Sequence, residues 1–259
     1  MLHLTREEAG AVAVWNGAKS RGKQRRPALP EGMRIYAVGD VHGRVDLLEQ
    51  VMARIDADLA KGGSANAIEV YLGDYIDRGP ASRQVVDRLI ARGAERNTIF
   101  LKGNHETYVA EFIANPAILA DWRQYGGLET LMSYGLQPAI KADAAEQIEL
   151  AKAFKFMVPK SHQHFLKSLP LCVSFGDFFF VHAGVKPRVP LKLQREEDLL
   201  WIRDDFLLYE DDFEKVIVHG HTPVREPDIR PNRINIDTGA YATGRLTCIV
   251  LEQDRIEIL

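Results

Sequence analysis

Five of the eight histidines lie in four short polar clusters that also contain glycine, namely GDVHGR, GNHE, VHAG and HGHT. The first two of these contain aspartate or asparagine, and a further cluster, GDYIDRGP, supplies two more aspartates. They supply imidazole, carboxylate and amide ligands without a thiolate, a set that suits Mn, Fe or Zn in a catalytic site rather than a structural cysteine site. The glycines let the backbone turn tightly around the side chains. The ordered set therefore predicts a metal centre.

Asp40 and His42 are the first two candidate ligands and stand two residues apart, directly after an apolar run. In extended backbone, side chains two apart point the same way, so we expect both to bind one ion. A single GDxHG could equally be an ordinary turn. The repetition of the pattern at several sites favours metal binding.

Three of the clusters resemble the signature motifs of the phosphoprotein phosphatase family of metallophosphoesterases, especially its bacterial and phage members. They are GDVHGR at Gly39–Arg44, GDYIDRGP at Gly73–Pro80 and GNHE at Gly103–Glu106, and the downstream VHAG, LLWIR and HGHTP segments match as well. The resemblance runs from about Met33 to the C-terminus. It implies an α/β fold, a calcineurin-like β-sandwich flanked by helices, with two metal ions at its edge.

The resemblance also implies a role for each matched position. One group would bind the metals, with the first ion on two residues, a bridging carboxylate, and the second ion on three more: Asp40 and His42, Asp74, then Asn104, His182 and His221. In the family, His105 is the general acid and Asp77 orients it. Arg78 and Arg203 would hold the phosphate oxygens. His219 is interpreted as a support outside the ligand set.

The chemistry of these groups agrees with phosphate monoester hydrolysis. Two cations ~3.5 to 4 Å apart make a bridging hydroxide available near neutral pH and neutralise charge during its direct attack on phosphorus. Guanidinium forks match phosphate oxygens, and a histidine bonded to a carboxylate can protonate the leaving oxygen. The expected cofactors are two divalent ions, most simply Mn, with Fe or Zn as alternatives.

The elements that position these residues are apolar runs, each ending in a polar cluster. Six such runs are predicted as strands: Arg34–Gly39, Ile68–Gly73, Thr98–Lys102, Phe178–Val181, Lys215–Val218 and Arg233–Ile236. Helical periodicity lies between the first runs, as in the spacing of Leu48, Val51, Met52 and Ile55. This alternation predicts an α/β sheet, in which ligands collect beyond the carboxyl ends of the strands.

Three regions are expected along the chain. Residues 1–32 read as an N-terminal helix and basic linker, which includes KSRGKQRR, and residues 33–259 as the catalytic domain. Within that domain, residues at about 106–169 show aromatic-rich helical signals and are predicted to form a helical insertion. Most of its aromatic residues are expected to pack against the domain, although some could line a substrate groove. Two closing antiparallel strands are expected at Arg245–Val250 and Arg255–Leu259.

Composition restricts the partners. The formal net charge of -3 selects neither nucleic acid nor an anionic membrane, and no uncharged apolar run approaches the ~20 residues that span a bilayer. Two cysteines without CxxC spacing favour a reducing compartment, so a cytoplasmic location is expected. The expected partner is a phosphorylated protein or a small phosphoester, and the oligomeric state is left open.

Two enzymatic functions fit the motifs. A serine/threonine-type protein phosphatase ranks first, and a diadenosine tetraphosphatase-like nucleotide hydrolase is the alternative. Asp77 and the glutamate of GNHE favour the first, because the second branch typically has alanine and aspartate there. DTGAYATG at Asp237–Gly244 departs from the eukaryotic branch, so its regulatory partners are not carried over. A binding module on an inactive scaffold conflicts with the complete set of candidate ligands.

Overall fold

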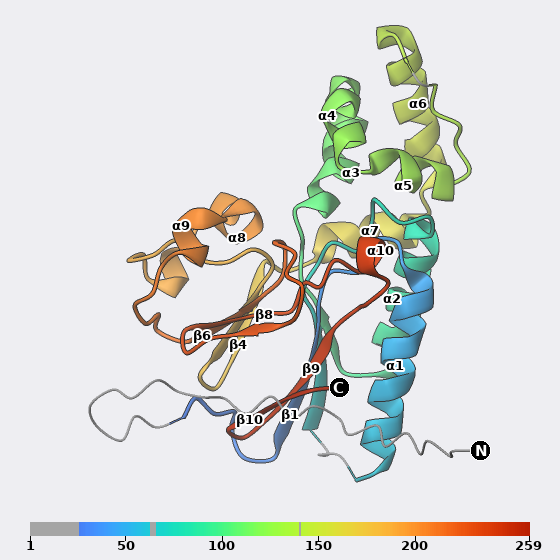
Figure 1. Ribbon diagram of the computed structural model, residues 1–259. Helices are drawn as coiled ribbons and strands as arrows, with labels where there is room; N and C mark the ends of the chain where they lie inside the picture. The colour runs from blue at the N-terminus through green and yellow to red at the C-terminus, as the bar shows by residue number, and fades with distance from the viewer. Residues whose placement is uncertain (1–25, 63–65, 140) are drawn as a thin grey trace, which may run out of the picture.

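The computed structural model describes residues 26–62, 66–139 and 141–259, so the predicted N-terminal helix and most of the basic linker lie outside the described residues. Two five-stranded sheets form the body of the molecule (Figure 1). In spatial order the first sheet contains β10 (Arg255–Ile258), β9 (Cys248–Glu252), β1 (Met33–Val38), β2 (Asn66–Tyr71) and β3 (Thr98–Phe100). The second contains β4 (Cys172–Phe175), β5 (Phe178–Val181), β6 (Val216–His219), β8 (Arg233–Asn235) and β7 (Asp228–Ile229).

The two sheets share one apolar core, and each buries its outer face under helices. In β1, Ile35 packs into the shared core with Phe178 of β5, whereas Tyr36 belongs to the core on the helical side. This alternation follows from the two-residue period of a strand. The helices over the first sheet are α1 (Val45–Ala60) and α2 (Ser82–Glu95), and the predicted apolar face of α1 is buried.

The second sheet has its own helical cover, at the opposite side of the molecule from α1 and α2 in Figure 1. Phe179 of β5 packs with Leu199 of α8 (Glu196–Trp201) and Phe206 of α9 (Asp204–Leu207). Two sheets face to face with helices outside them form a layered α/β sandwich. The predicted fold class is confirmed.

The direction of the strands determines where the polar clusters lie. β1, β2 and β3 run parallel to one another, and β5, β6 and β8 form a second parallel set. Parallel neighbours present their carboxyl ends at the same edge of a sheet. All six predicted runs overlap one of these strands, so the clusters that follow them are brought to one edge of the sandwich.

Strand β4 was not predicted from the sequence. It pairs with β5 as an antiparallel hairpin in which Phe175 lies opposite Phe178, and Gly176 and Asp177 form the two-residue turn. Gly176 has a φ of +52°, a left-handed conformation that favours glycine. A Gly-Asp pair between two apolar runs is a recognised hairpin signal and would have located β4.

Between β3 and β4 the chain folds into helices that project from the sandwich (Figure 1) and are called the insertion helices below. They are α3 (His105–Ala114), η1 (Pro116–Ile118), α4 (Leu119–Gln124), α5 (Gly127–Ser133), α6 (Ala144–Met157) and α7 (Lys160–Ser168). Phe112, Trp122 and Phe154 form their buried centre. Two aromatic side chains depart from this packing, Tyr125 with 37% and Phe156 with 88% exposure.

Two short helices complete the fold, η2 (Leu191–Leu193) and α10 (Ala240–Thr243). Across the described ranges, none of the helices combines the length and apolarity that crossing a membrane requires.

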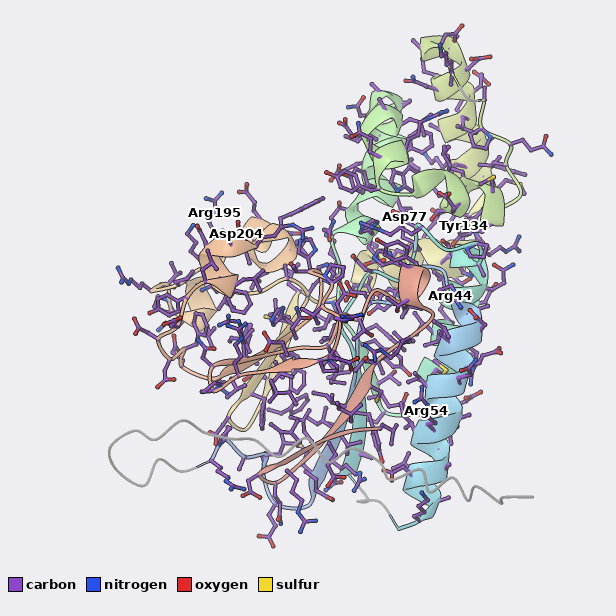
Figure 2. All side chains as sticks on the ribbon, in the orientation of Figure 1. Arg44, Arg54, Asp77, Tyr134, Arg195 and Asp204 are labelled. Atoms are coloured by element: carbon purple, nitrogen blue, oxygen red, sulfur yellow. The ribbon has the colours of Figure 1, made fainter. Side chains whose placement is uncertain are left out.

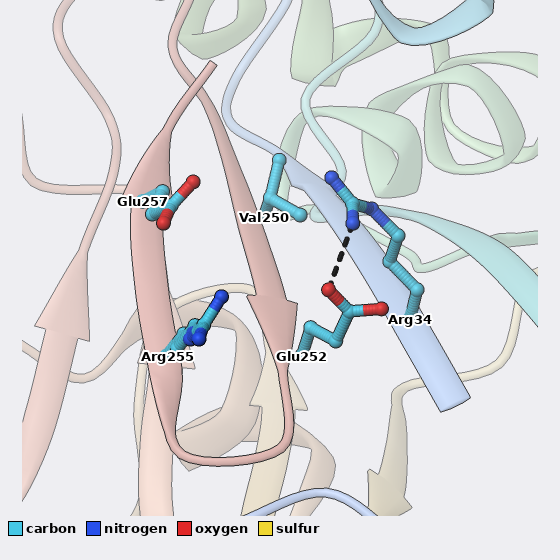
Figure 3. A pocket seen from close by; sticks show the side chains of 5 residues that line it. All are labelled: Arg34, Val250, Glu252, Arg255 and Glu257. Atoms are coloured by element: carbon cyan, nitrogen blue, oxygen red, sulfur yellow. Dashed lines mark hydrogen bonds and ion pairs between the residues drawn. The ribbon is translucent and has the colours of Figure 1, made fainter. Parts of the chain in front are cut away.

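A small pocket of about 100 Å³ lies over β1, β9 and β10, away from the strand-end clusters (Figure 3). Arg34 stands in it and donates to Glu252 at 2.8 Å, as well as to Asp58 and the hydroxyl of Tyr36. The guanidinium of Arg34 already has three hydrogen-bonding partners. We therefore assign the charged residues of this pocket a structural role, in an ion-pair network that joins β1, β9 and α1.

Arg92 of α2 forms a second, more deeply buried ion-pair network. Its guanidinium donates to Glu69 of β2, with 2.6 Å between Nη2 and Oε1, and to Asp56 of α1 at 2.9 Å. The side chains of Arg92 and Glu69 are almost fully buried, whereas Asp56 is partly exposed. The charge of Glu69 therefore depends on Arg92 for compensation.

Arg92→Met is expected to lower the free energy of unfolding by about 3–5 kcal/mol, because it leaves the buried charge of Glu69 unpaired. The matched change Arg88→Met on the same helix breaks only a partly exposed pair with Glu95 and should cost at most about 1 kcal/mol. Urea unfolding of both variants measures the difference. Equal losses would contradict the assigned importance of the buried pair.

Candidate active site

The predicted site residues converge at the carboxyl ends of the two parallel strand sets, around an open pocket of about 240 Å³. Seven of the ten line it: His42, Asp74, Arg78, Asn104, His105, Arg203 and His221. The other three, Asp40, Asp77 and His182, are buried and hydrogen-bonded to residues that line it. The pocket is also lined by Tyr125, Pro223, Asp237 and Tyr241.

One group of ligand atoms gathers around Asn104. Its Oδ1 lies 2.9 Å from His182 Nε2 and 2.9 Å from His221 Nδ1. The two ring nitrogens are 3.2 Å apart, and Asp74 Oδ1 is 3.3 Å from His182 Nε2. Asp74, His182 and His221 also form one of the groups in the described residues that could hold a metal ion.

The protonation of the histidine rings explains why this group suits a cation. His182 Nδ1 lies 2.9 Å from the carbonyl oxygen of Leu72, so it carries the proton and donates to that oxygen. Burial lowers the pKa of His182 and of His221, and both rings are therefore neutral. His182 Nε2 therefore carries no proton, and its lone pair faces the lone pairs of the Asn104 and Asp74 oxygens. Several electron pairs with at most one proton between them fit a positive ion.

The second group lies on the other side of Asp74. His42 donates from Nδ1 to the carbonyl oxygen of Ile76 at 3.0 Å, and its Nε2 is 3.4 Å from Asp74 Oδ2. His105 Nε2 is 3.7 Å from the same oxygen. These three residues form another possible metal-binding group. Asp74 thus faces one group with each of its carboxylate oxygens.

Asp40 does not adopt the geometry predicted for it relative to His42. β1 ends at Val38, and His42 has a φ of +45°, so the backbone between them turns instead of extending. Asp40 Oδ2 accepts from the backbone N–H of His221 at 2.9 Å, whereas its Oδ1 is buried without a hydrogen-bond partner. A buried oxygen with no donor is costly unless a cation satisfies it.

Buried negative charge accumulates around Asp40. Burial, followed by the charges of Asp237 and Asp74, raises the pKa of Asp40. Burial likewise raises the pKa of Asp237 to about 6, with a further contribution from Asp74. The ionised carboxylate of Asp74 thus disfavours ionisation of Asp40 and Asp237, and divalent cations would stabilise the charged forms of all three. The donor set therefore fits the two expected ions.

His105 and Asp77 form a buried hydrogen-bonded pair, with 2.7 Å between Nδ1 and Oδ2. Residues of α4 and α5 hold the carboxylate, and Asp77 is labelled near the base of the projecting helices in Figure 2. Trp122 Nε1 donates to Oδ2 at 2.8 Å, and the hydroxyl of Thr130 donates to Oδ1 at 2.6 Å. Burial lowers the pKa of His105, but the carboxylates of Asp74 and Asp77 outweigh it, so the pKa is raised overall.

Glu106 fixes the two loops that carry Asp74 and Asn104. Its buried carboxylate accepts from three backbone N–H groups, those of Asp74 at 3.0 Å, Tyr75 at 2.8 Å and Gly103 at 2.8 Å. Because these groups follow β2 and β3, one side chain sets the spacing between the two loops.

The two candidate arginines approach the pocket from different elements. Arg78 donates from Nη1 to the hydroxyl of Tyr241 at 2.6 Å, and its guanidinium lies 4.7 Å from the centre of that ring. Arg203, ahead of α9, donates to Thr222 Oγ1 at 3.3 Å. Tyr241 therefore orients Arg78, a role that the sequence analysis did not identify.

Backbone strain concentrates at this site. In the described residues, seven non-glycine positions have a left-handed φ, and five of them are predicted site residues: His42, Asp74, Asp77, Arg78 and His221. Each such conformation costs roughly 1–3 kcal/mol and persists only where surrounding contacts enforce it. Gly79 shows the constraint directly, because a Cβ there would lie 2.1 Å from the carbonyl oxygen of His42.

Several residues of the site were not found by sequence reasoning. Asp237 and Tyr241 stand in DTGAYATG, which was noticed only for its departure from the eukaryotic branch. Trp122 and Thr130 lie in helices whose apolar pattern gave no sign of a polar contact. His219, interpreted as a support for the ligands, donates from Nδ1 to the carbonyl oxygen of Gly220 and packs edge-on against Phe206.

The fold and the site together define a metallophosphoesterase. The calcineurin-like phosphoesterase family matches residues 33–248, and the chain belongs to this family. A bis(5'-nucleosyl)-tetraphosphatase PrpE [asymmetrical] from Bacillus velezensis is 28% identical over 237 residues, which cover 81% of this chain and 86% of that protein.

Solved structures agree on the fold. A structure described as a diadenosine tetraphosphatase has a TM-score of 0.61 at 19% identity, over 87% of this chain and 92% of that one. A protein serine/threonine phosphatase from Saccharomyces cerevisiae has a TM-score of 0.55 at 16% identity, over 90% and 83%. At these identities the likeness concerns the fold alone. The predicted resemblance to this group of phosphoesterases is confirmed.

Asp74→Asn is expected to reduce bound metal, because the change removes a charge that faces both groups of ligand atoms. Loss of a residue that only supports a ligand typically costs 10–100-fold in affinity, so removal of a ligand should exceed about 100-fold. Elemental analysis after gel filtration of protein loaded with Mn(II) measures the stoichiometry. Asp212→Asn, on the exposed loop before β6, is the control. Equal metal content in both variants would refute a central place for Asp74.

Proposed function

We propose that this metallophosphoesterase hydrolyses bis(5'-nucleosyl) tetraphosphates. The observation that carries the proposal is the similarity to PrpE along most of both chains. It favours the alternative of the sequence analysis over the protein phosphatase that ranked first. An asymmetrical cleavage adds water across one phosphoanhydride bond, so a nucleoside monophosphate and a nucleoside triphosphate are released. A nucleotide substrate would also suit the cytoplasmic location expected from the cysteine content.

In this proposal the strand-end loops would hold two divalent ions. Asp40 and His42 would bind one, Asn104, His182 and His221 would bind the other, and Asp74 would be shared by both. The unsatisfied oxygen of Asp40 and the facing lone pairs around Asn104 support this assignment. Such ions, when bound, lower the pKa of a coordinated water and offset charge on the phosphoryl oxygens. The mixture of nitrogen and oxygen donors favours Mn.

The remaining residues would bind and protonate the substrate. Arg78 and Arg203 both line the pocket and can offer paired N–H donors to phosphate oxygens. His105 would give its proton to the departing oxygen, and Asp77 would hold the ring in position and favour its charged form. Trp122 and Thr130 occupy the two oxygens of Asp77, which keeps the carboxylate directed at the ring.

A second function, hydrolysis of phosphoserine or phosphothreonine, is favoured by the pair of His105 and Asp77. An alkoxide is a poor leaving group without protonation, whereas a phosphate leaves an anhydride more readily. A strongly held proton donor is therefore more valuable for an alkyl phosphate. Initial rates with diadenosine tetraphosphate and with a phosphoserine peptide, measured with Mn(II)-loaded enzyme, decide between the two. A larger kcat/KM for the peptide would overturn the nucleotide proposal.

Chelation is expected to abolish hydrolysis of either substrate, and added Mn(II) should restore it. The reason is that the metal ions activate the attacking water, and the side chains that bind them cannot do so alone. Activity is measured after dialysis against a chelator and again after titration with Mn(II), Zn(II) or Mg(II). Full activity in metal-free enzyme would rule out the two-ion assignment.

His105→Asn is expected to keep both metals while reducing turnover of an alkyl phosphate by ~10²–10⁴-fold. The loss should be markedly smaller for nitrophenyl phosphate and for diadenosine tetraphosphate, since their leaving groups depart more readily as anions. His164→Asn, a change on α7 in a different part of the molecule, serves as the control. If chemistry is rate-limiting and all three substrates lose activity equally, His105 does not protonate the leaving oxygen.

A further inference from the structure

Tyr125 is distinguished from the other aromatic residues of the insertion helices by its place at the pocket. Phe112, Trp122 and Phe154 are fully buried, and Phe156 is exposed on α6 without lining the pocket. Tyr125, at the C-terminal end of α4, lines the pocket and keeps 37% of its surface exposed. Among the described insertion aromatics it is thus the one that a bound substrate can contact.

The ring of Tyr125 is held in place before any ligand binds. Tyr108 stacks on it, with 5.6 Å between ring centres and 29° between planes, and is itself stacked on Trp122 at 6.2 Å and 3°. Trp201, from the helix over the second sheet, meets Tyr125 edge-on at 6.4 Å. Because neighbours fix the ring, stacking a ligand on it would cost little side-chain entropy.

Tyr125 also lies next to the proposed proton donor. Its ring centre is 6.1 Å from that of His105, at 89° between planes. A leaving oxygen within hydrogen-bond reach of His105 would direct the group attached to it past Tyr125. The other tyrosine of the pocket, Tyr241, carries the guanidinium of Arg78 against its ring at 4.7 Å and contacts His42 edge-on. Tyr125 therefore offers the more accessible aromatic surface.

We propose that Tyr125 is a stacking platform for a nucleobase of the substrate, supported from behind by Tyr108 and at its edge by Trp201. This inference rests on the proposed function, since it names the part of a nucleotide that the insertion helices recognise. Aromatic stacking suits this task because every base has a π-face, so binding would depend little on which base is present. The phosphates would meanwhile lie toward Arg78 and Arg203.

The test compares two ligands that differ in the base alone, adenosine 5'-monophosphate and ribose 5-phosphate. Each is measured as a competitor of glycerol phosphate hydrolysis by the Mn(II)-loaded full chain. Stacking on one fixed ring predicts that the nucleotide binds about 5- to 150-fold more tightly than the sugar phosphate. Because both ligands carry the same phosphate, the ratio of their inhibition constants cancels any change in metal or phosphate binding.

Tyr125→Leu should bring the ratio close to one, and Tyr125→Phe should keep it, because the ring is retained. Phe156→Leu removes an exposed aromatic side chain of α6 and should leave the ratio unchanged. Thermal melting of each variant shows that the fold is intact. A wild-type ratio near one, or an undiminished ratio in Tyr125→Leu, overturns the platform.

Failure of the platform is distinguishable from failure of the proposed function. Turnover of diadenosine tetraphosphate together with a ratio near one would remove the platform and keep the function. A high ratio that Tyr125→Leu abolishes, in an enzyme that prefers the phosphoserine peptide, would support the platform as a nucleotide subsite and remove the function.

Discussion

The carboxylate of Asp74 is the interaction on which the rest of the site depends. It is buried, accepts the backbone N–H of His105 at 3.1 Å, and faces imidazole nitrogens of three histidines. Burial raises its pKa, but His182, His105 and His42, once they are protonated in acid, outweigh that effect and hold the pKa of Asp74 well below its usual range. One ionised group thus joins loops from both sheets, and the carboxyl groups of Asp40 and Asp237 lie close enough for its charge to raise their pKa values.

Holding these groups together requires a rigid frame, because the local backbone does not favour the arrangement. The left-handed residues cluster where the loops turn back after their strands, and Gly43 and Gly79 allow two of those loops to touch. The sandwich core and the Arg92 network stabilise the frame, and the three N–H bonds to Glu106 fix the loops that follow β2 and β3. Stability elsewhere in the fold therefore offsets the strain at the site.

The sequence allowed the sheet and the convergence of its clusters to be predicted because both follow from local patterns, the apolar runs and the polar residues after them. The hairpin containing β4 was overlooked although Gly176 and Asp177 signal it. The predicted geometry of Asp40 and His42 was wrong, because the backbone between them turns and is not extended. Contacts such as those of Trp122 and Thr130 with Asp77 join segments about 45 and 53 residues apart, and no local pattern encodes them.

The two structural parts of the molecule divide the proposed chemistry between them. Loops at the sheet edge would supply the metal donors, and these would be common to any phosphoester that the fold hydrolyses. The insertion helices would supply the residues that contact the leaving group. They hold the carboxylate of Asp77 against His105, and they place the ring of Tyr125 beside His105. A strongly oriented donor favours an alkyl ester, and an accessible ring favours a nucleotide. Substrate choice within this fold is thus expected to lie in the insertion helices, because metal ligands that every substrate shares cannot discriminate between leaving groups.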